Sequence, residues 1–236
     1  MLEIMVETLA DALAAEAGGA TQLDLKSALP IGGLTPSAGM IEQVCGGVHI
    51  PVLVMIRPHA RSFAFSNAEV AVMCGDILTA RKLGADAFLT GCLTKDLRID
   101  VEAVKALQEA AGALPVHFHL AWEMATDPDQ ALETLIELGV QSARINGGGI
   151  EGRAVDGMNA VKRYARLAQG RIELFLAGGV SLESLPRLMQ GSVVSNVHVG
   201  RAARTPQTQY GTVESHAVRA LAEALEHAVF GLRDVR

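Results

Sequence analysis

The 236 residues of this chain are half hydrophobic and only 4 % aromatic, which argues against disorder and allows one large domain with a substantial core. A formal net charge of −6 leaves no basic patch for nucleic acid and no polybasic membrane signal, and no apolar run reaches the roughly 18 residues of a membrane span. The first segment has no basic region typical of a secretory signal, and Cys45, Cys74 and Cys92 are too few for a disulfide framework. We therefore expect a cytoplasmic protein.

Short β-rich runs alternate with helical patterns from one end of the sequence to the other. In chain order, the expected strands are Leu2–Glu7, Gln22–Ser27, Pro51–Arg57, Ala87–Leu93, Pro115–Trp122, Ser142–Asn146, Ile172–Ala177 and Asn196–Gly200. The expected helices are Thr8–Ala17, Pro36–Val44, Asn67–Leu83, Val101–Ala111, Asp127–Leu138, Ala154–Ala168, Leu182–Met189 and Glu214–Val229.

Eight such pairs predict parallel βαβ units and, from these, a (β/α)₈ barrel (TIM barrel) as a single α/β domain over residues 1–236. An open, doubly wound sheet is the alternative. It would normally carry a glycine-rich dinucleotide turn after the first strand, and Val6–Leu9 contains no glycine. The barrel is therefore the prediction.

The chemistry of such a barrel lies at the C-terminal ends of the strands, where residues of one parity point inward. The inward candidates are Glu3, Asp24, Lys26, Arg57, Thr90, Cys92, His117, His119, Arg144, Asn146 and His198. A buried charge costs several kcal/mol unless it is paired, so this concentration of polar residues indicates a functional site. Mutual neutralisation of the acidic and basic side chains is the structural alternative.

Two glycine-containing turns indicate a phosphate site. Gly178, Gly179 and Ser181 follow the seventh expected strand, and Gly200 and Arg201 follow the eighth, each before an expected helix. Glycine lets backbone N–H groups approach an anion, and a helix N-terminus adds positive potential. The alternative is that these are tight turns that need glycine for a positive φ.

Two histidines and an acid–base pair are candidates for catalysis. His117 and His119 lie on one face of the fifth expected strand, and with Asp24 or Glu3 they would bind a metal or act as acid and base. The alternative is that they are satisfied core residues. Asp24 and Lys26 resemble the Asp-x-Lys pairs of barrels that perform carbanion chemistry, although a simple internal salt bridge would give the same pattern.

The cysteines form a weak metal pattern. Cys45 and Cys74 fall in expected helices, and only Cys92 ends a strand that faces the predicted site. Copper(I) prefers thiolate and thioether ligands, and Cys92 has at most Met5 and Met55 as soft neighbours.

Several motifs occur in an order that resembles the CutC family, which is named for a proposed role in copper homeostasis. They are the opening Met1–Ile4, the run Gly32–Ser37, Met55–Pro58, Phe118-His119, Gly147-Gly148, Gly178–Val180 and His198. The resemblance implies a (β/α)₈ barrel that assembles as a homodimer or a higher homo-oligomer. It also implies four site residues, Glu3, Arg57, His119 and His198.

The sequence departs from the family pattern where soft ligands would be. Met5 stands where the family generally has a cysteine, and Asp24-Leu25-Lys26 replaces Glu-Leu-Cys. The segment His59–Phe63 replaces Arg-Gly-Gly-Asp-Phe, and His119–Glu123 replaces His-Arg-Ala-Phe-Asp. These changes remove thiols and add a cation, which disfavours copper(I).

The leading hypothesis is an enzyme or binder that acts on a small anionic, phosphorylated metabolite, with isomerase, aldolase or lyase chemistry. Gly178–Ser181, Gly200 and Arg201 would hold the phosphate. Arg57 and Lys26 would stabilise a developing oxyanion, and His119 or Asp24 would move the proton.

Two alternatives remain open. The first is a copper-binding or copper-trafficking protein with Cys92, His117 and His119 as ligands to copper(I). The second is a scaffold barrel that has kept the fold and lost the activity.

Overall fold

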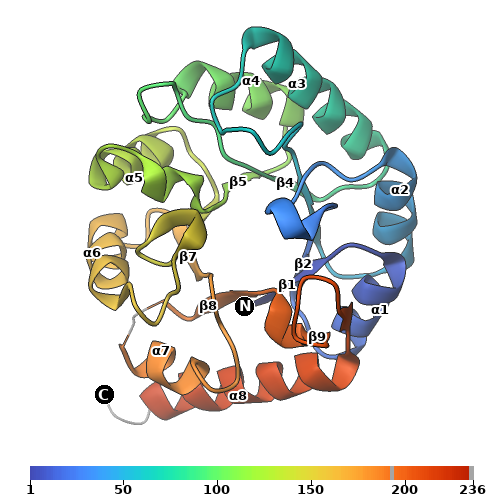
Figure 1. The fold of residues 1–236 in the computed structure, drawn as a ribbon, viewed down its shortest axis with the longest axis vertical. Coiled ribbons are helices and arrows are strands. Elements are labelled where there is room, and N and C mark those ends of the chain that lie inside the picture. The colour runs from blue at the N-terminus through green and yellow to red at the C-terminus, as the bar shows by residue number, and fades with distance from the viewer. Residues whose placement is uncertain (192–193, 234–236) are drawn as a thin grey trace.

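Eight parallel strands close into a barrel in the order of the chain, β1 to β8, and a ring of helices surrounds them (Figure 1). The computed structural model describes residues 1–191 and 194–233. The strands are β1 Leu2–Val6, β2 Gln22–Leu25, β3 Val52–Met55, β4 Ala87–Thr90, β5 Val116–Phe118, β6 Ser142–Ile145, β7 Glu173–Leu176 and β8 Asn196–Val199. The predicted TIM-barrel fold is confirmed. The predicted domain, residues 1–236, also includes 192–193 and 234–236, which lie outside the described residues.

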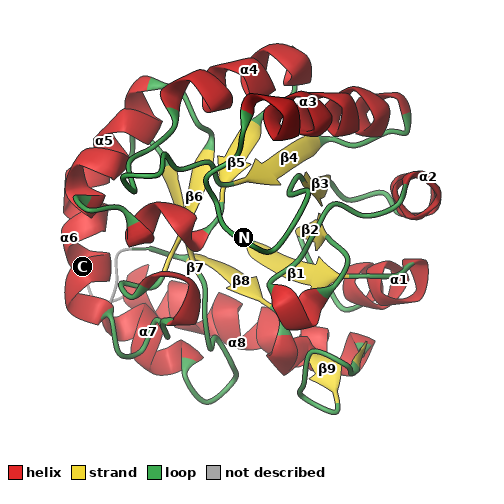
Figure 2. Ribbon diagram, turned by 45° about the horizontal axis from the view of Figure 1, so that its top comes forward, coloured by secondary structure: helices red, strands yellow, loops and turns green. Residues whose placement is uncertain are grey.

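Helices follow the strands and cover the outside of the barrel (Figure 2). They are α1 Leu9–Ala17, α2 Ala38–Gly47, α3 Asn67–Lys82, α4 Val101–Ala111, α5 Pro128–Glu137, α6 Met158–Ala168, α7 Leu185–Gly191 and α8 Ser215–Arg233. Short 3₁₀ helices occupy loops after the strands, at η1 Leu29–Ile31, η2 Leu120–Met124, η3 Gly149–Glu151 and η4 Arg201–Ala203. None of the described helices combines the length and the apolar character needed to cross a membrane.

The main apolar core lies between the strands and the helices. Outward-facing strand residues such as Val54 and Phe88 pack in one cluster with helix residues such as Ile77 and Leu107, and all four are fully buried. The other parity of each strand faces the barrel interior. This arrangement separates an apolar outer layer, which stabilises the fold, from a polar interior, which forms the site.

The fifth strand is shorter than predicted, because Pro115–Trp122 does not stay extended. β5 ends at Phe118, and the Nδ1 atom of His119 accepts a hydrogen bond of 3.2 Å from the N–H of Ala121. This contact starts the 3₁₀ helix η2 and turns Trp122 into the core, where its Nε1 donates to the carbonyl of Arg144 at 2.9 Å.

The helices expected directly after the phosphate turns begin later. α7 starts at Leu185 rather than Leu182, and Gly200 leads into the three-residue η4 instead of a long helix. After Gly200 the chain is held by Arg204, which is buried and donates to Asp11 Oδ2 at 3.3 Å and to the Gly211 carbonyl at 2.6 Å. These contacts hold a small hairpin, β9 Arg204–Thr205 with β10 Thr212–Val213, before α8 begins. α6 likewise begins at Met158 rather than Ala154, whose N–H donates to the carbonyl of Gly178.

Removing apolar volume between the strands and helices should destabilise the fold. We expect Leu107→Ala, in α4, to lower the free energy of unfolding by about 2 to 5 kcal/mol, because a fully buried leucine leaves a cavity. Chemical denaturation measures this. The matched control is Leu78→Ala on the neighbouring α3, where the side chain is 46 % exposed and the change should be within about 0.5 kcal/mol. Equal losses in the two variants would contradict the assignment of the core.

Candidate functional site

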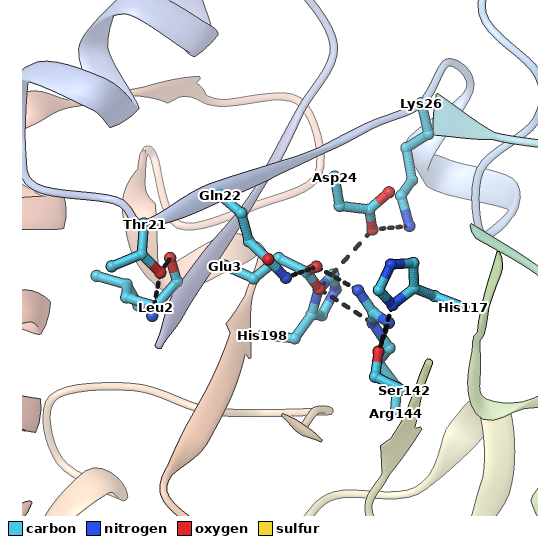
Figure 3. Close-up of polar contacts among 10 residues, drawn as sticks. All are labelled: Leu2, Glu3, Thr21, Gln22, Asp24, Lys26, His117, Ser142, Arg144 and His198. Carbon is cyan, nitrogen blue, oxygen red and sulfur yellow. Dashed lines mark hydrogen bonds and ion pairs between the residues drawn. The ribbon is translucent and has the colours of Figure 1, made fainter. Parts of the chain in front are cut away.

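The interior of the barrel, toward the C-terminal ends of the strands, is lined by polar side chains. Most of the residues predicted there are present, and several of them contact one another (Figure 3). The buried polar residues are Glu3, Gln22, Asp24, Lys26, Arg57, His117, His119, Ser142, Arg144 and Asn146, and His198 is partly buried.

Glu3 is the centre of a polar network in the barrel interior. Its carboxylate accepts hydrogen bonds from Arg144 Nε at 3.0 Å and Gln22 Nε2 at 2.7 Å, and it also contacts Arg144 Nη2 and, at 2.6 Å, His198 Nδ1. Complete burial alone would raise the pKa of Glu3, but Arg144 and His198 hold the pKa well below its usual range. Glu3 is therefore an ionised carboxylate inside the barrel.

The network continues from Arg144 to the fifth strand. Arg144 Nη1 donates to Ser142 Oγ at 2.8 Å, and the same hydroxyl contacts His117 Nδ1 at 2.6 Å. Burial and the charge of Arg144 lower the pKa of His117 to about 3. His117 is therefore a neutral imidazole at physiological pH.

Asp24 and Lys26 form the second ion pair of the interior. Lys26 Nζ lies 2.6 Å from Asp24 Oδ2, and both side chains are buried. Asp24 Oδ1 is also buried and has no hydrogen-bond partner among the described residues. Mutual neutralisation, the alternative left open by the sequence, thus accounts for Asp24 with Lys26 and for Glu3 with Arg144.

Arg57 has no carboxylate partner within the described part of the chain. Its Nη1 donates to the carbonyls of Ile31 and Gly33, each at 3.2 Å, and its Nη2 donates to that of Ala60 at 3.4 Å. The guanidinium lies over the ring of Phe63 at 4.6 Å, and Nε is buried without a hydrogen-bond partner. Burial lowers the pKa of Arg57, yet a guanidinium remains charged in proteins. A buried cation therefore stands without a counter-ion.

The Gly32-Gly33 run of the family motif packs against both cations. Gly33 has a φ of 92°, and a Cβ there would lie 2.5 Å from Lys26 Cδ. Gly32 has a φ of 90°, and its Cβ would lie 3.2 Å from Arg57 Nη1. The two glycines let the loop after β2 close over Lys26 and Arg57.

His119 is a neutral hydrogen-bond donor. Because the N–H of Ala121 can only donate, Nδ1 of His119 must accept, and the ring proton is assigned to Nε2. Burial, followed by the charges of Lys26, Arg57 and Arg144, lowers the pKa of His119 well below its usual value. The ring lies against Gly91, where a Cβ would approach His119 Cε1 to 2.1 Å.

The prediction that Thr90 and Cys92 face the site is wrong. Since Gly91 faces the barrel interior, its two neighbours face the helices. Thr90 Oγ1 donates to the carbonyl of Ile56, and Cys92 packs in the outer core with Phe88. Burial raises the pKa of Cys92 to about 12, and its place in the outer core keeps the thiol away from the barrel interior.

Soft ligands do not converge elsewhere in the described interior either. Cys45 and Cys74 lie on α2 and α3, outside the barrel, and Met55 is an interior residue that is 2 % exposed. Met5 lies against Gly200, where a Cβ would approach Met5 Cε to 2.4 Å. One or two thioethers without a thiolate do not fit the ligand preference of copper(I).

One group of harder donors is close enough to hold a metal ion. Ligand atoms of Glu3, Asp24 and His198 lie within 4.8 Å of one another. Arg144 and Lys26 are in direct contact with the two carboxylates, so a metal ion would compete with two cations already in place. The charge of the surroundings does not favour a cation there.

The predicted phosphate turns have free backbone donors. The N–H groups of Gly178, Gly179 and Gly200 make no hydrogen bond to any described residue. β7 and β8 are adjacent, so both turns lie at the same end of the barrel. Ser181 is engaged locally instead, because its N–H donates to Ser184 Oγ at 2.9 Å and its Oγ accepts from the N–H of Ser184.

Arginine side chains flank these turns. Arg201, which the sequence predicts to hold a phosphate, is exposed on η4 directly after Gly200. Arg153, which the sequence analysis did not select, lies against Gly179, where a Cβ would be 3.2 Å from Arg153 Nε. No local motif marks Arg153, because only the fold brings the loop after β6 next to the turn after β7.

Glu123 is a second residue that the sequence analysis did not select. Its Oε1 accepts from the N–H groups of Asn146 and Gly147 at 3.0 and 2.9 Å, and its Oε2 accepts from Gly149 at 2.8 Å. Asn146 Nδ2 then donates to the carbonyls of Gly149 and Gly152. The backbone of the glycine run after β6 is therefore bound by the Glu123 carboxylate, and the Asn146 side chain supports it from within.

Comparison with known proteins identifies the family. The sequence profile of the CutC family matches residues 1–203. The chain belongs to the CutC family. A human relative named copper homeostasis protein cutC homolog is 40 % identical over 198 residues, which cover 84 % of this chain and 72 % of the human protein. A CutC family protein of Xanthomonas axonopodis is 33 % identical, covering 96 % of this chain and 99 % of its own length.

Solved structures agree with the barrel. The crystal structure of a protein from Streptococcus agalactiae, described as a candidate copper homeostasis protein CutC, superposes with a TM-score of 0.80 at 31 % identity and covers 85 % of this chain and 97 % of that protein. A thiamine phosphate pyrophosphorylase from Pyrococcus furiosus superposes with a TM-score of 0.62 at 12 % identity, covering 97 % of this chain and 96 % of that one. At such low identity this second similarity concerns the fold alone.

The buried neutral His117 should make stability depend on pH. Its pKa is about 3 in the folded protein and near 6.5 in the unfolded chain, so between these values only the unfolded chain binds the proton. The free energy of unfolding should therefore fall as the pH falls through this window, with His117 contributing at most about 1.4 kcal/mol per pH unit. We expect His117→Asn to reduce this slope, measured by urea denaturation from about pH 6 to about pH 4.

The control for this measurement is His216→Asn. His216 is exposed on α8, so its imidazole is hydrated in the folded and the unfolded chain alike. A slope that changes equally in both variants would show that burial of His117 is not the cause.

Proposed function

We propose that the C-terminal end of the barrel binds a small anionic, phosphorylated metabolite and converts it by isomerase, aldolase or lyase chemistry. The observation that carries this proposal is the buried guanidinium of Arg57, which has no carboxylate partner among the described residues and keeps a buried Nε without a hydrogen bond. Leaving a charge buried and unpaired costs several kcal/mol, and an anionic ligand would remove that cost.

The charge balance of the interior supports an anion. Glu3 is paired with Arg144, and Asp24 is paired with Lys26. Arg57 adds one positive charge to this balance. The neutral form of His119, which donates from Nε2, adds a hydrogen-bond donor without adding charge.

The phosphate group is assigned to the turns after β7 and β8. The free N–H groups of Gly178, Gly179 and Gly200 supply backbone donors, and Arg153 and Arg201 flank them. Donation by backbone amides in a concave turn suits an anion even without a long helix behind it. Ser181, which is engaged with Ser184, contributes to the shape of the turn rather than to phosphate binding.

A role in copper homeostasis is the second candidate, because relatives at 33 to 40 % identity carry that function or that family in their names. The group of Glu3, Asp24 and His198 is the observation in its favour. The position of Cys92 in the outer core, away from the interior, weighs against a copper(I) site at the mouth of the barrel.

Arg57→Ala should reduce ligand-induced stabilisation. A ligand at 100 times its Kd adds roughly 2.7 kcal/mol of stability, and a hydrogen bond to a charged group is worth about 1.5 to 3 kcal/mol. We therefore expect screening of wild type by thermal shift to find stabilising phosphorylated metabolites, and we expect Arg57→Ala to bind them at least about tenfold more weakly. Inorganic phosphate and sulfate serve as the simplest anionic probes.

The matched control is Arg61→Ala, four residues further along the same loop, where the side chain is 76 % exposed and pairs with Glu69. Its ligand stabilisation should equal that of wild type. If Arg57→Ala and Arg61→Ala respond alike to every phosphorylated probe, the anion site is not at Arg57.

Copper(I) binding should be independent of Cys92. Because its thiol is buried in the outer core and faces away from the barrel interior, Cys92→Ser should leave the copper(I) affinity of the reduced protein unchanged in a titration against a competing chelator. A loss of tenfold or more in that variant would favour the copper alternative over the anionic metabolite.

A further inference from the structure

We propose that His198 and His119 form a proton-transfer pair that enolises a phosphorylated α-hydroxy carbonyl compound, with His198 Nε2 as the base and His119 Nε2–H as the donor to the carbonyl oxygen. This inference rests on the proposed function and specifies its substrate class and its two catalytic residues. It differs from the sequence-based hypothesis, in which His119 or Asp24 moves the proton.

The assignment of His198 follows from its contact with Glu3. Glu3 is ionised because Arg144 is bound to it, and an ionised carboxylate can only accept hydrogen bonds. His198 Nδ1, which lies 2.6 Å from Glu3 Oε1, must therefore carry the hydrogen. This tautomer leaves the lone pair on Nε2, and the carboxylate behind Nδ1 holds the ring in one orientation, as in other histidine–carboxylate pairs that act as a base.

His198 also meets the requirement of access. Its side chain is 14 % exposed, whereas Glu3 and Asp24 are fully buried, and Nε2 makes no hydrogen bond to any described residue. Figure 3 shows the imidazole beside Glu3 and Arg144 in the barrel interior, with Asp24 on the other side. Part of the imidazole is therefore exposed, in contrast to the two neighbouring carboxylates.

His119 is held in the opposite tautomer. The N–H of Ala121 donates to its Nδ1, so its Nε2 carries the hydrogen. A neutral imidazole that donates to a carbonyl oxygen polarises it without taking part as a charged acid. The charges of Lys26 and Arg57 act on His119, and they would also stabilise a negative oxygen bound to it.

The remaining titratable groups of the interior are less suited to the role of base. Asp24 is in an ion pair with Lys26, and its side chain is inaccessible to solvent. His117 Nδ1 is engaged with Ser142, and its neighbour Arg144 opposes uptake of a proton. His198 alone among the described interior histidines has a carboxylate directly behind the ring.

The proposed step balances without a further reactant. His198 Nε2 takes the proton from the carbon that bears the hydroxyl group, and the electron pair of that C–H bond forms the C=C bond of an enediolate. The π pair of the carbonyl moves onto oxygen, which accepts a hydrogen bond from His119 Nε2–H. Return of a proton from His198 to carbon restores the carbonyl, and in D₂O the returned hydron is deuterium.

The test is solvent exchange followed by ¹H NMR in D₂O. The probes are dihydroxyacetone phosphate, ribulose phosphate and fructose phosphate, and glycerol phosphate, which has no carbonyl group, is the control compound. The same probes are scored for stabilisation by thermal shift. We expect at least one probe to stabilise wild type and to lose the proton next to its carbonyl, while glycerol phosphate exchanges nothing.

His198→Gln should slow this exchange by about 10² to 10⁴-fold while retaining stabilisation by the same probe, since general-base catalysis contributes a factor of that size. His119→Gln should also slow exchange and gives an independent variant. The matched control is His59→Gln. His59 Nε2 lies 2.8 Å from Glu69 Oε1, so it forms a similar histidine–carboxylate pair outside the barrel, and its loss should leave exchange unchanged.

The outcomes separate the two proposals. If carbonyl probes stabilise wild type but none of them exchanges above the enzyme-free rate, the proton-transfer pair is overturned and the anion site is left intact. Exchange that persists in His198→Gln has the same consequence. If none of the three carbonyl probes stabilises wild type, the enolisation proposal is overturned. If inorganic phosphate and the metabolite screen also fail to distinguish wild type from Arg57→Ala, the proposed function is overturned with it.

Discussion

The carboxylate of Glu3 is the constraint around which the barrel interior is organised. It lies on β1, and it contacts Gln22 on β2, Arg144 on β6 and His198 on β8. An ionised carboxylate at zero exposure is stable only when such partners surround it, because the cost of desolvation would otherwise exceed any local gain. Arg144 then orders Ser142 and, through it, His117 on β5. A single buried charge thus links five strands, β1, β2, β5, β6 and β8, in one polar network.

The same constraint determines what the rest of the interior can bind. With Glu3 and Asp24 each paired to a cation, Arg57 stands as an additional positive charge, and the loop that contains Gly32 and Gly33 closes over it. This unpaired cation is the basis of the proposal that the interior binds an anion. Membership of the CutC family agrees with the barrel fold. The names of several relatives refer to copper, but no set of soft ligands for copper(I) comes together at this end of the described structure.

Two kinds of feature could not be predicted from the sequence. One is which residues of a strand face the barrel interior, and the other is which loops lie next to each other in the fold. On β4 the residues of both parities are small, apolar or neutral, so the pattern did not show that Gly91 rather than Cys92 faces the barrel. Residues two apart on a strand point to the same side, so the rule that selected Asp24 and Lys26 on β2 also places Gln22 inside the barrel. On β6 the same rule places Ser142 inside, together with Arg144. The signal for these two residues was present, but their short or uncharged side chains made them less conspicuous.

The sequence by itself determined the alternation of strands and helices, the barrel, the family and most of the polar residues of the interior, because these depend on periodicity and on local motifs. Only the tertiary structure decided how the charges pair, since Glu3 and Arg144 are 141 residues apart and meet only across the closed barrel. It also decided which nitrogen of His119 and of His198 carries the proton. That choice depends on a partner, Ala121 N–H for one ring and the Glu3 carboxylate for the other, which sequence spacing alone does not place.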